Sequence, residues 1–487
     1  MTGIHVIITC IIVFLAINMI IIFRLHKTPD SFEAYSVGNR SFGFVFYSWT
    51  YLGYWYVGTA YITWFSTSAS VGLFAQYLLL YSMASLVIFY FMAKPVWTWS
   101  KLYQLETQAD LIELRYQSPL FRHIFSILTF FFWFPWIILE MKAVGYTISA
   151  ATGNVIDYNL GMVIICLYII IYTFYGGARG AAIGSAIQAI CFTVLGICIT
   201  GFLIWKTYGG IAPLFDLVSQ KKPELLVLPK RYDGLYWSSV IITSTLGAFC
   251  LPGIFRLLYL ADSYRTIRKT TCFAPVIGIP NFFLLLLLAL GGTLLPGFPE
   301  NPDVSFFWIA GTYGGNLVLG LAAVVALCAS MSTVSAVINT SAVIISKDWI
   351  GGIFHKATRK EMLKYAKGAT IAAGTLSLYI ASINIPNLLF IAQLMYDFVV
   401  QAIVPLLVGL YWKKSNLIGA GAGMISGIVI AILGNVFPAA IAWAGGWSPG
   451  MVGLMANVII HVLCGFLFGK QKHVDELFDH WQKVYDL

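Results

Sequence analysis

Residues 320–349, GLAAVVALCASMSTVSAVINTSAVIISKDW, form an apolar stretch interrupted by small and hydroxyl-bearing residues. The stretch exceeds the ~20 residues that a helix needs to cross a bilayer. Ala329, Ser332 and Thr333 stand at positions i, i+3 and i+4, so they share one helical face. Two hydroxyls and a backbone carbonyl on one face suit a hard cation, which prefers oxygen ligands. Hydroxyls also join membrane helices to one another, so the pattern fits either a cation site or helix packing.

The composition of the whole chain is that of a polytopic membrane protein. Apolar residues make up 59% of the chain and charged residues 10%. Many runs are long enough for membrane helices, and the short alternating segments typical of β-barrels are absent. We therefore predict an all-α polytopic membrane protein embedded in a lipid bilayer. Residues 4–23 lack a basic leader and are too long for a signal peptide, so we expect them to be the first span.

Thirteen membrane-spanning helices are expected, at residues 4–23, 42–66, 71–93, 121–149, 158–176, 181–205, 235–260, 272–296, 314–346, 367–384, 388–411, 416–437 and 450–469. An odd number places the two ends of the chain on opposite sides. Lys and Arg gather on alternate connections, which should therefore face the cytoplasm. This predicts the N-terminus outside and the C-terminus inside. The net charge of +9 reflects this topology and does not indicate binding of nucleic acid.

Signatures of an enzyme are absent from the sequence. We find no nucleotide-binding loop, no G-x-S-x-G and no paired catalytic residues in the predicted loops. The cysteines and histidines show no metal-ligand spacing. The sequence therefore predicts a protein that is not an enzyme.

Two predicted spans contain helix-breaking residues at corresponding positions of two halves. The second span contains Gly53 and Gly58, and the seventh contains Gly247, Pro252 and Gly253. Paired breaks of this kind indicate a binding site at the middle of the membrane in an inverted-repeat transporter. The five-span offset between the breaks places the hydroxyl face of the ninth span where such folds bind a cation.

The chain resembles the sodium:solute symporter family, which includes carriers of proline, pantothenate, sialic acid and galactose. The matching stretches, in chain order, are YSVGNRSFG (35–43), TQADLIELRYQS (107–118), YGGARGAAIGSAIQA (175–189), CLPGIFRLLYLADS (250–263), ASMSTVSAVINTSA (329–342) and VPLLVGLYWKKSNLIGAGAGMISG (404–427). The resemblance implies a LeuT-type 5+5 inverted repeat. The extra N-terminal helix would occupy residues 1–30, the two repeats 31–205 and 206–414, and two further helices with a cytoplasmic tail 415–487.

The same resemblance implies a sodium site between the second and ninth spans. Its ligands would be the carbonyls of Gly53, Tyr56 and Ala329 and the hydroxyls of Ser332 and Thr333. Five neutral oxygens suit an ion that must bind and leave in every transport cycle. The expected function is cation-coupled import of a small organic solute, most simply with sodium, by alternating access at the cytoplasmic membrane.

The sequence departs from the family pattern at two acidic positions. Trp55 stands where proline-type members carry an Asp, and Gly184-Ser185 replaces a Thr-Asp pair. We therefore expect at most one coupling ion, and coupling to protons is an alternative. Arg256 lies one place from the usual family Arg, which prevents a direct transfer of that residue's role.

Three ionisable residues lie within predicted spans: Glu140 and Lys142 in the fourth, and Asp397 in the eleventh. A charge in the membrane costs at least ~2.5–3.5 kcal/mol, so each should face a partner or a wet cavity. Glu140 and Asp397 are expected at similar depth, where they could act in coupling. The alternative is a structural ion pair of Lys142 with either acid.

The expected substrate site is partly aromatic. Tyr54 and Trp55 would wall it, and the resemblance places Trp136 and Glu140 on the cavity face of the fourth span; Trp237 and Gln393 are further candidate contacts. The aromatic residues could instead serve helix packing. Opposite charges near the cavity favour a small carboxylate or a zwitterion as solute. A membrane sensor that works with a separate signalling partner is the alternative function, and the sequence does not determine the oligomeric state.

Overall fold

The computed structural model describes residues 3–26, 28–230, 233–354, 357–383 and 388–483. Within these ranges the chain is helical and forms no strand, and an isolated bridge joins Phe42 to Ala261. The α-helices are α1 (Gly3–Leu25), α2 (Phe32–Val37), α3 (Phe44–Trp55), α4 (Thr63–Val71), α5 (Tyr77–Tyr103), α6 (Gln108–Tyr116), α7 (Pro119–Ala151), α8 (Tyr158–Tyr208), α9 (Ile211–Lys221), α10 (Gly234–Cys250), α11 (Pro252–Leu260), α12 (Tyr264–Gly292), α13 (Ser305–Ile309), α14 (Asn316–Val343), α15 (Arg359–Ser382), α16 (Leu388–Val399), α17 (Gly409–Tyr411), α18 (Leu417–Val436), α19 (Pro449–Phe468) and α20 (Val474–Lys483).

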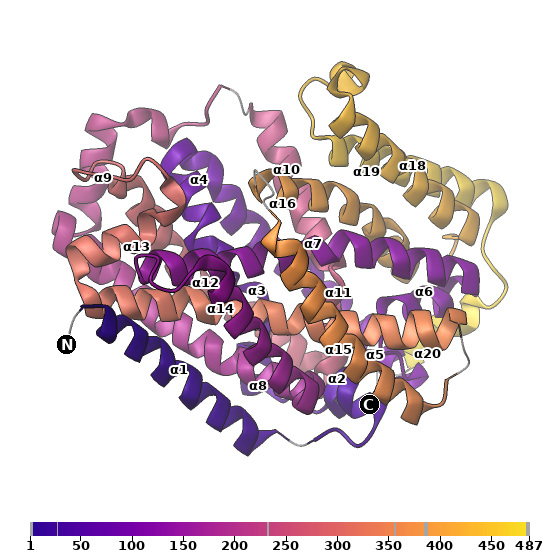
Figure 1. The fold of residues 1–487 in the computed structure, drawn as a ribbon. Coiled ribbons are helices and arrows are strands. Elements are labelled where there is room, and N and C mark those ends of the chain that lie inside the picture. The colour runs from indigo at the N-terminus through magenta and orange to yellow at the C-terminus, as the bar shows by residue number, and fades with distance from the viewer. Residues whose placement is uncertain (1–2, 27, 231–232, 355–356, 384–387, 484–487) are drawn as a thin grey trace.

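Helix α14 lies inside the bundle and α1 lies at its edge (Figure 1). Of an apolar stretch of 18 residues, 78% is buried in the span Asn316–Gly352, which begins with α14, and 22% is buried in α1. Both helices are strongly apolar, so hydropathy alone does not explain the difference. Helix α14 carries many Ala and Ser residues, which let it pack closely against α8, α7 and α1. This packing places Ala329, Ser332 and Thr333 in the interior, with at most 1% of each exposed.

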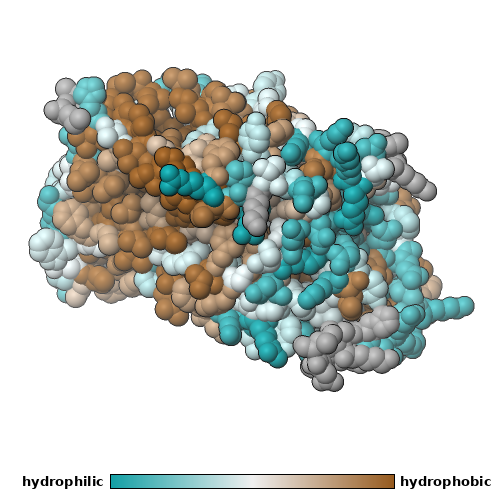
Figure 2. Space-filling model, turned by 90° about the horizontal axis from the view of Figure 1, so that it is seen from below, coloured by the Kyte–Doolittle hydropathy of each residue, from teal (hydrophilic) through white to brown (hydrophobic). Residues whose placement is uncertain are grey.

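Apolar side chains cover much of the molecular surface. On α1 they include the exposed residues Ile12, Val13, Ile17 and Ile20. In Figure 2 apolar side chains occupy the broad part of the visible face, and polar side chains gather toward its right-hand end. An apolar surface of this extent is expected for a protein that faces lipid.

Nine helices of the described chain are long and apolar enough to cross a membrane, or ten if α10 and α11 form one bent span. Two of them, Gly58–Tyr103 and Tyr158–Tyr208, contain 46 and 51 residues. At ~1.5 Å per residue, each would be about twice as long as the hydrocarbon core is thick. The longer one covers the predicted spans 158–176 and 181–205, and the shorter one covers 71–93 and the last part of 42–66. Within the longer one the backbone turns at Gly177, where φ is 53°. The predicted span 367–384 falls on α15, which does not pass this test, and residue 384 lies outside the described residues. The count of thirteen stays a prediction.

Both predicted helix breaks are present. Helix α3 ends at Trp55, Tyr56 and Val57 are extended, and the 3-10 helix η2 (Gly58–Tyr61) leads into α4. Helices α10 and α11 meet at Leu251 with a bend of 52°. The segments before α3 and after α11 are joined by backbone hydrogen bonds through Phe42. The two broken segments are thus held side by side.

Candidate functional site

At the first break, the backbone on either side comes unusually close to two neighbouring helices. A methyl group added at Gly58 would lie 1.7 Å from the Ser330 hydroxyl of α14, and one added at Gly53 would lie 2.4 Å from the Ser185 carbonyl of α8. Only glycine allows this approach. Tyr56 N donates to Leu52 O at 2.9 Å, after which the helix stops. Carbonyls of a last helical turn lack helical partners and are free to bind other groups.

Four of the five predicted cation ligands converge at this break. The Thr333 hydroxyl lies 3.1 Å from Tyr56 O and 3.2 Å from Ala329 O, and the Ser332 hydroxyl donates to Ala329 O at 2.8 Å. The fifth predicted ligand, the Gly53 carbonyl, belongs to the preceding turn of α3. No hydrogen bond joins it to the other four in the part of the chain that the structure describes.

The chemistry of these oxygens fits an alkali-metal ion. All of them are neutral and buried, and the hydroxyl hydrogens can rotate away to expose lone pairs. The described residues contain no group of three or more His, Cys, Asp or Glu side chains that could hold a metal. Neutral oxygens bind sodium weakly enough for release, whereas a carboxylate cage would favour divalent ions.

Glu140 of α7 binds the other side of the same break. Its carboxylate accepts hydrogen bonds from Gly58 N at 2.8 Å, Thr59 N at 3.4 Å and the Thr59 hydroxyl at 2.8 Å. The side chain is fully buried. A carboxylate here satisfies amides at the start of the second half of the broken span, where the helix dipole favours negative charge. The sequence placed Glu140 on the face of the substrate cavity; in the structure its bonds go to the break.

Lys142 and Asp397 each have other partners. Lys142 Nζ donates to Ile383 O, at the end of α15, at 2.8 Å. Asp397 accepts from Asn435 of α18 at 3.0 Å and lies against Gly450 of α19. No ion pair joins Glu140, Lys142 and Asp397 among the described residues, so the ion pairs considered as their structural role do not form.

A narrow aromatic cavity lies between the two breaks. It is lined by Tyr54, Trp55, Val57, Tyr81, Trp133, Trp136, Leu251, Ile254 and Tyr396. Three predicted substrate residues, Tyr54, Trp55 and Trp136, thus share one cavity. Its mainly apolar lining, drawn from five helices and from both breaks, is typical of a small-molecule site.

Trp237 and Gln393 lie outside that lining. The Trp237 indole donates to Phe74 O at 3.1 Å, and the Gln393 amide oxygen accepts from Tyr236 at 3.5 Å. Glu140 is also absent from the lining. The structure therefore unites only part of the predicted substrate set.

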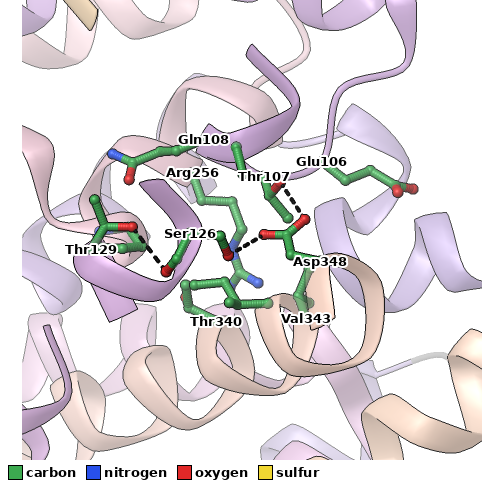
Figure 3. Close-up of a pocket in the computed structure, with 12 residues that line it drawn as sticks. Glu106, Thr107, Gln108, Ser126, Thr129, Arg256, Thr340, Val343 and Asp348 are labelled. Atoms are coloured by element: carbon green, nitrogen blue, oxygen red, sulfur yellow. Dashed lines mark hydrogen bonds between the residues drawn. The ribbon is translucent and has the colours of Figure 1, made fainter. Parts of the chain in front are cut away.

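A second narrow cavity lies next to the C-terminal end of α14. It is lined by Glu106, Thr107, Gln108, Ala109, Ser126, Thr129, Pro252, Arg256, Thr340, Val343, Ile344 and Asp348, most of which Figure 3 labels. Sequence reasoning missed this cavity. The stretches 107–118 and 329–342 contribute to it, but the sequence predicted no cavity at their far end.

A buried ion cluster closes this end of the molecule. Lys347 Nζ contacts Glu106 at 2.6 Å and Asp110 at 2.7 Å, while Arg122 contacts Asp110 at 3.0 Å and Asp348 at 3.1 Å. Burial would raise the pKa of Asp110, but Lys347 and Arg122 outweigh it and hold that pKa below its ordinary value. The cluster joins the start of α6, the start of α7 and the π-helix η7 (Ile344–Phe354) that continues α14.

Known proteins resemble this chain in sequence and in fold. The sequence profile of the sodium:solute symporter family matches residues 35–427. The chain is 24% identical over 466 residues to the uncharacterized symporter YhjB of Bacillus subtilis, covering 92% of this chain and 94% of that one. It is 22% identical over 524 residues to the monocarboxylic acid transporter of Corynebacterium glutamicum, covering 96% and 92%.

Two solved structures share the fold. A substrate-bound, outward-open Na⁺-coupled sialic acid symporter superposes with a TM-score of 0.78 at 18% identity, covering 97% of this chain and 98% of that one. A nucleobase-cation-symport-1 family transporter in a closed conformation gives a TM-score of 0.59 at 13% identity, covering 94% and 99%. The fold is that of a LeuT-like transporter. This multi-pass membrane protein is a solute symporter and not an enzyme, and it belongs to the sodium:solute symporter family.

Proposed function

We propose that the protein couples sodium to the import of a small organic solute across the cytoplasmic membrane. The observation that carries this proposal is the Thr333 hydroxyl, which lies within hydrogen-bond distance of Tyr56 O on the broken span and Ala329 O on α14. A sodium ion among Tyr56 O, Ala329 O, Ser332 and Thr333 would tie the two helices together. It would thereby preorganise the break, which forms one wall of the aromatic cavity. The Gly53 carbonyl is the fifth ligand we propose.

Coupling requires only that each ligand improves the affinity of the other. Such reciprocal effects are typically ~1–3 kcal/mol. The solute would contact Tyr54, Trp55 and Trp136 in the cavity. Trp237 and Gln393 would contact it on the way in, and Glu140 would transmit the state of the break to α7. Lys142 and Asp397 hold α15, α18 and α19 in place.

The solute we propose is a small carboxylate or a zwitterion. The monocarboxylic acid transporter of Corynebacterium glutamicum, which aligns over most of this chain, supports the carboxylate. We also propose the 5+5 repeat at 31–205 and 206–414, thirteen spans and a cytoplasmic C-terminus. Cysteines introduced at Ser118 and Ser219, after removal of the native thiols, test that orientation. An impermeant reagent should label only Ser219→Cys in intact cells, and labelling of only Ser118→Cys would reverse it.

Transport in proteoliposomes tests the function. We expect an inward sodium gradient, but not a potassium gradient, to drive uptake from a panel of monocarboxylates and amino acids. Uptake driven by a proton gradient without sodium would favour the proton-coupled alternative. Absence of uptake for every solute under both gradients would contradict the proposal.

A further inference from the structure

Arg256 is a buried cation without a counter-ion. It lies in α11, directly after the second helix break, and only 2% of it is exposed. Its Nη2 donates to the Asn339 amide oxygen at 2.6 Å. Its Nε and Nη1 groups make no hydrogen bond of good geometry, although the Tyr54 hydroxyl lies beside the guanidinium, and no carboxylate lies within salt-bridge distance among the residues the structure describes. A buried unpaired charge is expensive, so it calls for an explanation.

The acidic residues of the same cavity are already paired. Asp348 accepts hydrogen bonds from Thr107, Ser126 and Arg122. Glu106 binds Lys347 and Arg359. In Figure 3 the Arg256 side chain runs among these residues toward Thr340 and Val343. The guanidinium therefore enters the cavity while the nearby carboxylates point their oxygens at other groups.

Other unpartnered donors accompany Arg256. The Asn339 Nδ2 group, on the residue that binds Arg256, has no partner among the described residues, and neither does the indole N–H of Trp133. Trp133 lies against Gly253, one turn before Arg256: a methyl at Gly253 would come within 2.7 Å of its ring. Several buried donors without an acceptor form a surface suited to an anion. A carboxylate matches the fork of a guanidinium best.

The two cavities follow one another along the same two helices. On α7, Trp133 and Trp136 line the aromatic cavity, and Ser126 and Thr129 line the second. On α11, Ile254 lines the former and Arg256 the latter. Tyr54, in the wall of the aromatic cavity, has its hydroxyl beside the Arg256 guanidinium. Arg256 thus stands at the passage from one cavity to the other.

We infer that Arg256 binds the carboxylate of the transported solute as the solute passes from the aromatic cavity into the second cavity. This inference rests on the proposed function. Both cavities are narrow in this structure, so the bound state is one in which the surrounding helices have moved apart. The solute is then a carboxylate, and the neutral analogue in which an amide replaces that group is a poor ligand.

The test uses the purified full-length protein with sodium present and two matched probe pairs, acetate with acetamide and propionate with propionamide. Titration calorimetry should show binding of the carboxylates and not of the amides. Arg256→Gln should weaken carboxylate binding by at least about tenfold, while Arg256→Lys retains part of it. Arg265→Gln, an exposed arginine at the start of α12, is the matched control and should bind as the wild type does.

Asn339→Asp provides a second variant, because it supplies Arg256 with an internal carboxylate. This variant should melt at or above the wild-type temperature and yet lose carboxylate binding, since the internal acid competes for the guanidinium. Wild-type binding of acetate by folded Arg256→Gln, or by Asn339→Asp, would overturn the inference. So would equal binding of acetamide, or displacement of acetate by equimolar chloride.

The same proteins separate the two proposals. Sodium-driven uptake that is unchanged in Arg256→Gln would refute the role of Arg256 and leave the symporter proposal standing. Wild-type uptake restricted to neutral solutes would have the same meaning. No sodium-driven uptake of any solute by the wild type would refute both.

Discussion

The middle of α14 and the π-helix η7 at its end accommodate buried polar groups in opposite ways. In α14, Ser332 and Thr333 meet neutral carbonyl oxygens at 2.8–3.2 Å. In η7, Lys347 and Asp348 meet opposite charges at 2.6–3.1 Å. The two groups stand about 14 residues apart, or ~20 Å along a helix.

The difference is one of strength and reversibility. A hydrogen bond between neutral groups contributes ~0.5–1.5 kcal/mol, so an arriving ion can replace it. Removing one member of a buried ion pair costs ~3–5 kcal/mol, because the other charge is left without a partner. We infer that the middle of α14 exchanges ligands during transport, whereas its end locks α6 and α7 until the molecule opens.

The largest effect is expected at the locked end. Lys347→Met leaves the carboxylates of Glu106 and Asp110 facing each other without their shared cation. Because Arg359 and Arg122 still face these two carboxylates, we expect a loss of ~3 kcal/mol in stability, the lower end of the range for a broken buried ion pair, seen as a lower melting temperature in detergent. A melting temperature equal to that of the wild type would show that the cluster does not lock the fold.

A smaller effect is expected at the break. Glu140→Gln keeps one acceptor for Gly58 and Thr59, but it removes the charge that these donors face. Uptake should fall by at least tenfold or change its pH dependence, while the loss of stability stays below ~3 kcal/mol, the upper range for a hydrogen bond to a charged group. Normal uptake with an unchanged pH profile would make Glu140 a structural cap only. Thr147→Ala, which removes a buried hydroxyl that donates to Ala143 O within α7, is the control.

The pH dependence of stability should reflect Asp110. Its pKa is held below the ordinary value, so its ion pairs stabilise the fold above that value, and the stabilisation is lost as pH falls through the lowered pKa. Asp110→Asn should therefore be less stable than the wild type at pH 7, with the gap narrowing below about pH 4. Melting temperatures from pH 7 to pH 3 measure this, and a constant gap would contradict it.

The smallest effect is expected at a surface pair. Lys413 contacts Asp475 at 3.1 Å, and both side chains are over 40% exposed. Solvent screens such pairs. Lys413→Ala should leave both uptake and melting temperature unchanged, and a marked fall would mean that charge pairing matters here regardless of burial.

The sequence grouped the proposed cation ligands more readily than the members of the ion cluster, for a physical reason. Ala329, Ser332 and Thr333 are neighbours on one helix, so spacing alone brings them together. Gly53 and Gly58 indicate the break because glycine is the residue that permits close approach of the backbone. The cluster unites Glu106, Asp110, Arg122 and Lys347 from three separate segments, and only tertiary packing shows that they meet.

The partners of single buried charges could not be predicted from the sequence either. Lys142 and Glu140 are two residues apart on α7 but have different partners. Lys142 binds the end of α15, and Glu140 binds the break. Arg256 was noted only as displaced from the family position. Its unpaired donors became visible once Asn339, Trp133 and the cavity walls were placed around it.

Binding of radiolabelled sodium to the purified protein, without solute, tests the central claim most directly. We predict a single sodium per chain that potassium does not displace. Thr333→Ala should weaken its binding by about tenfold, the equivalent of one lost ligand of ~1.4 kcal/mol, while Thr333→Ser and the control Thr147→Ala bind as the wild type does. Unchanged sodium binding in Thr333→Ala and in Ser332→Ala would contradict the placement of the ion between the first break and α14.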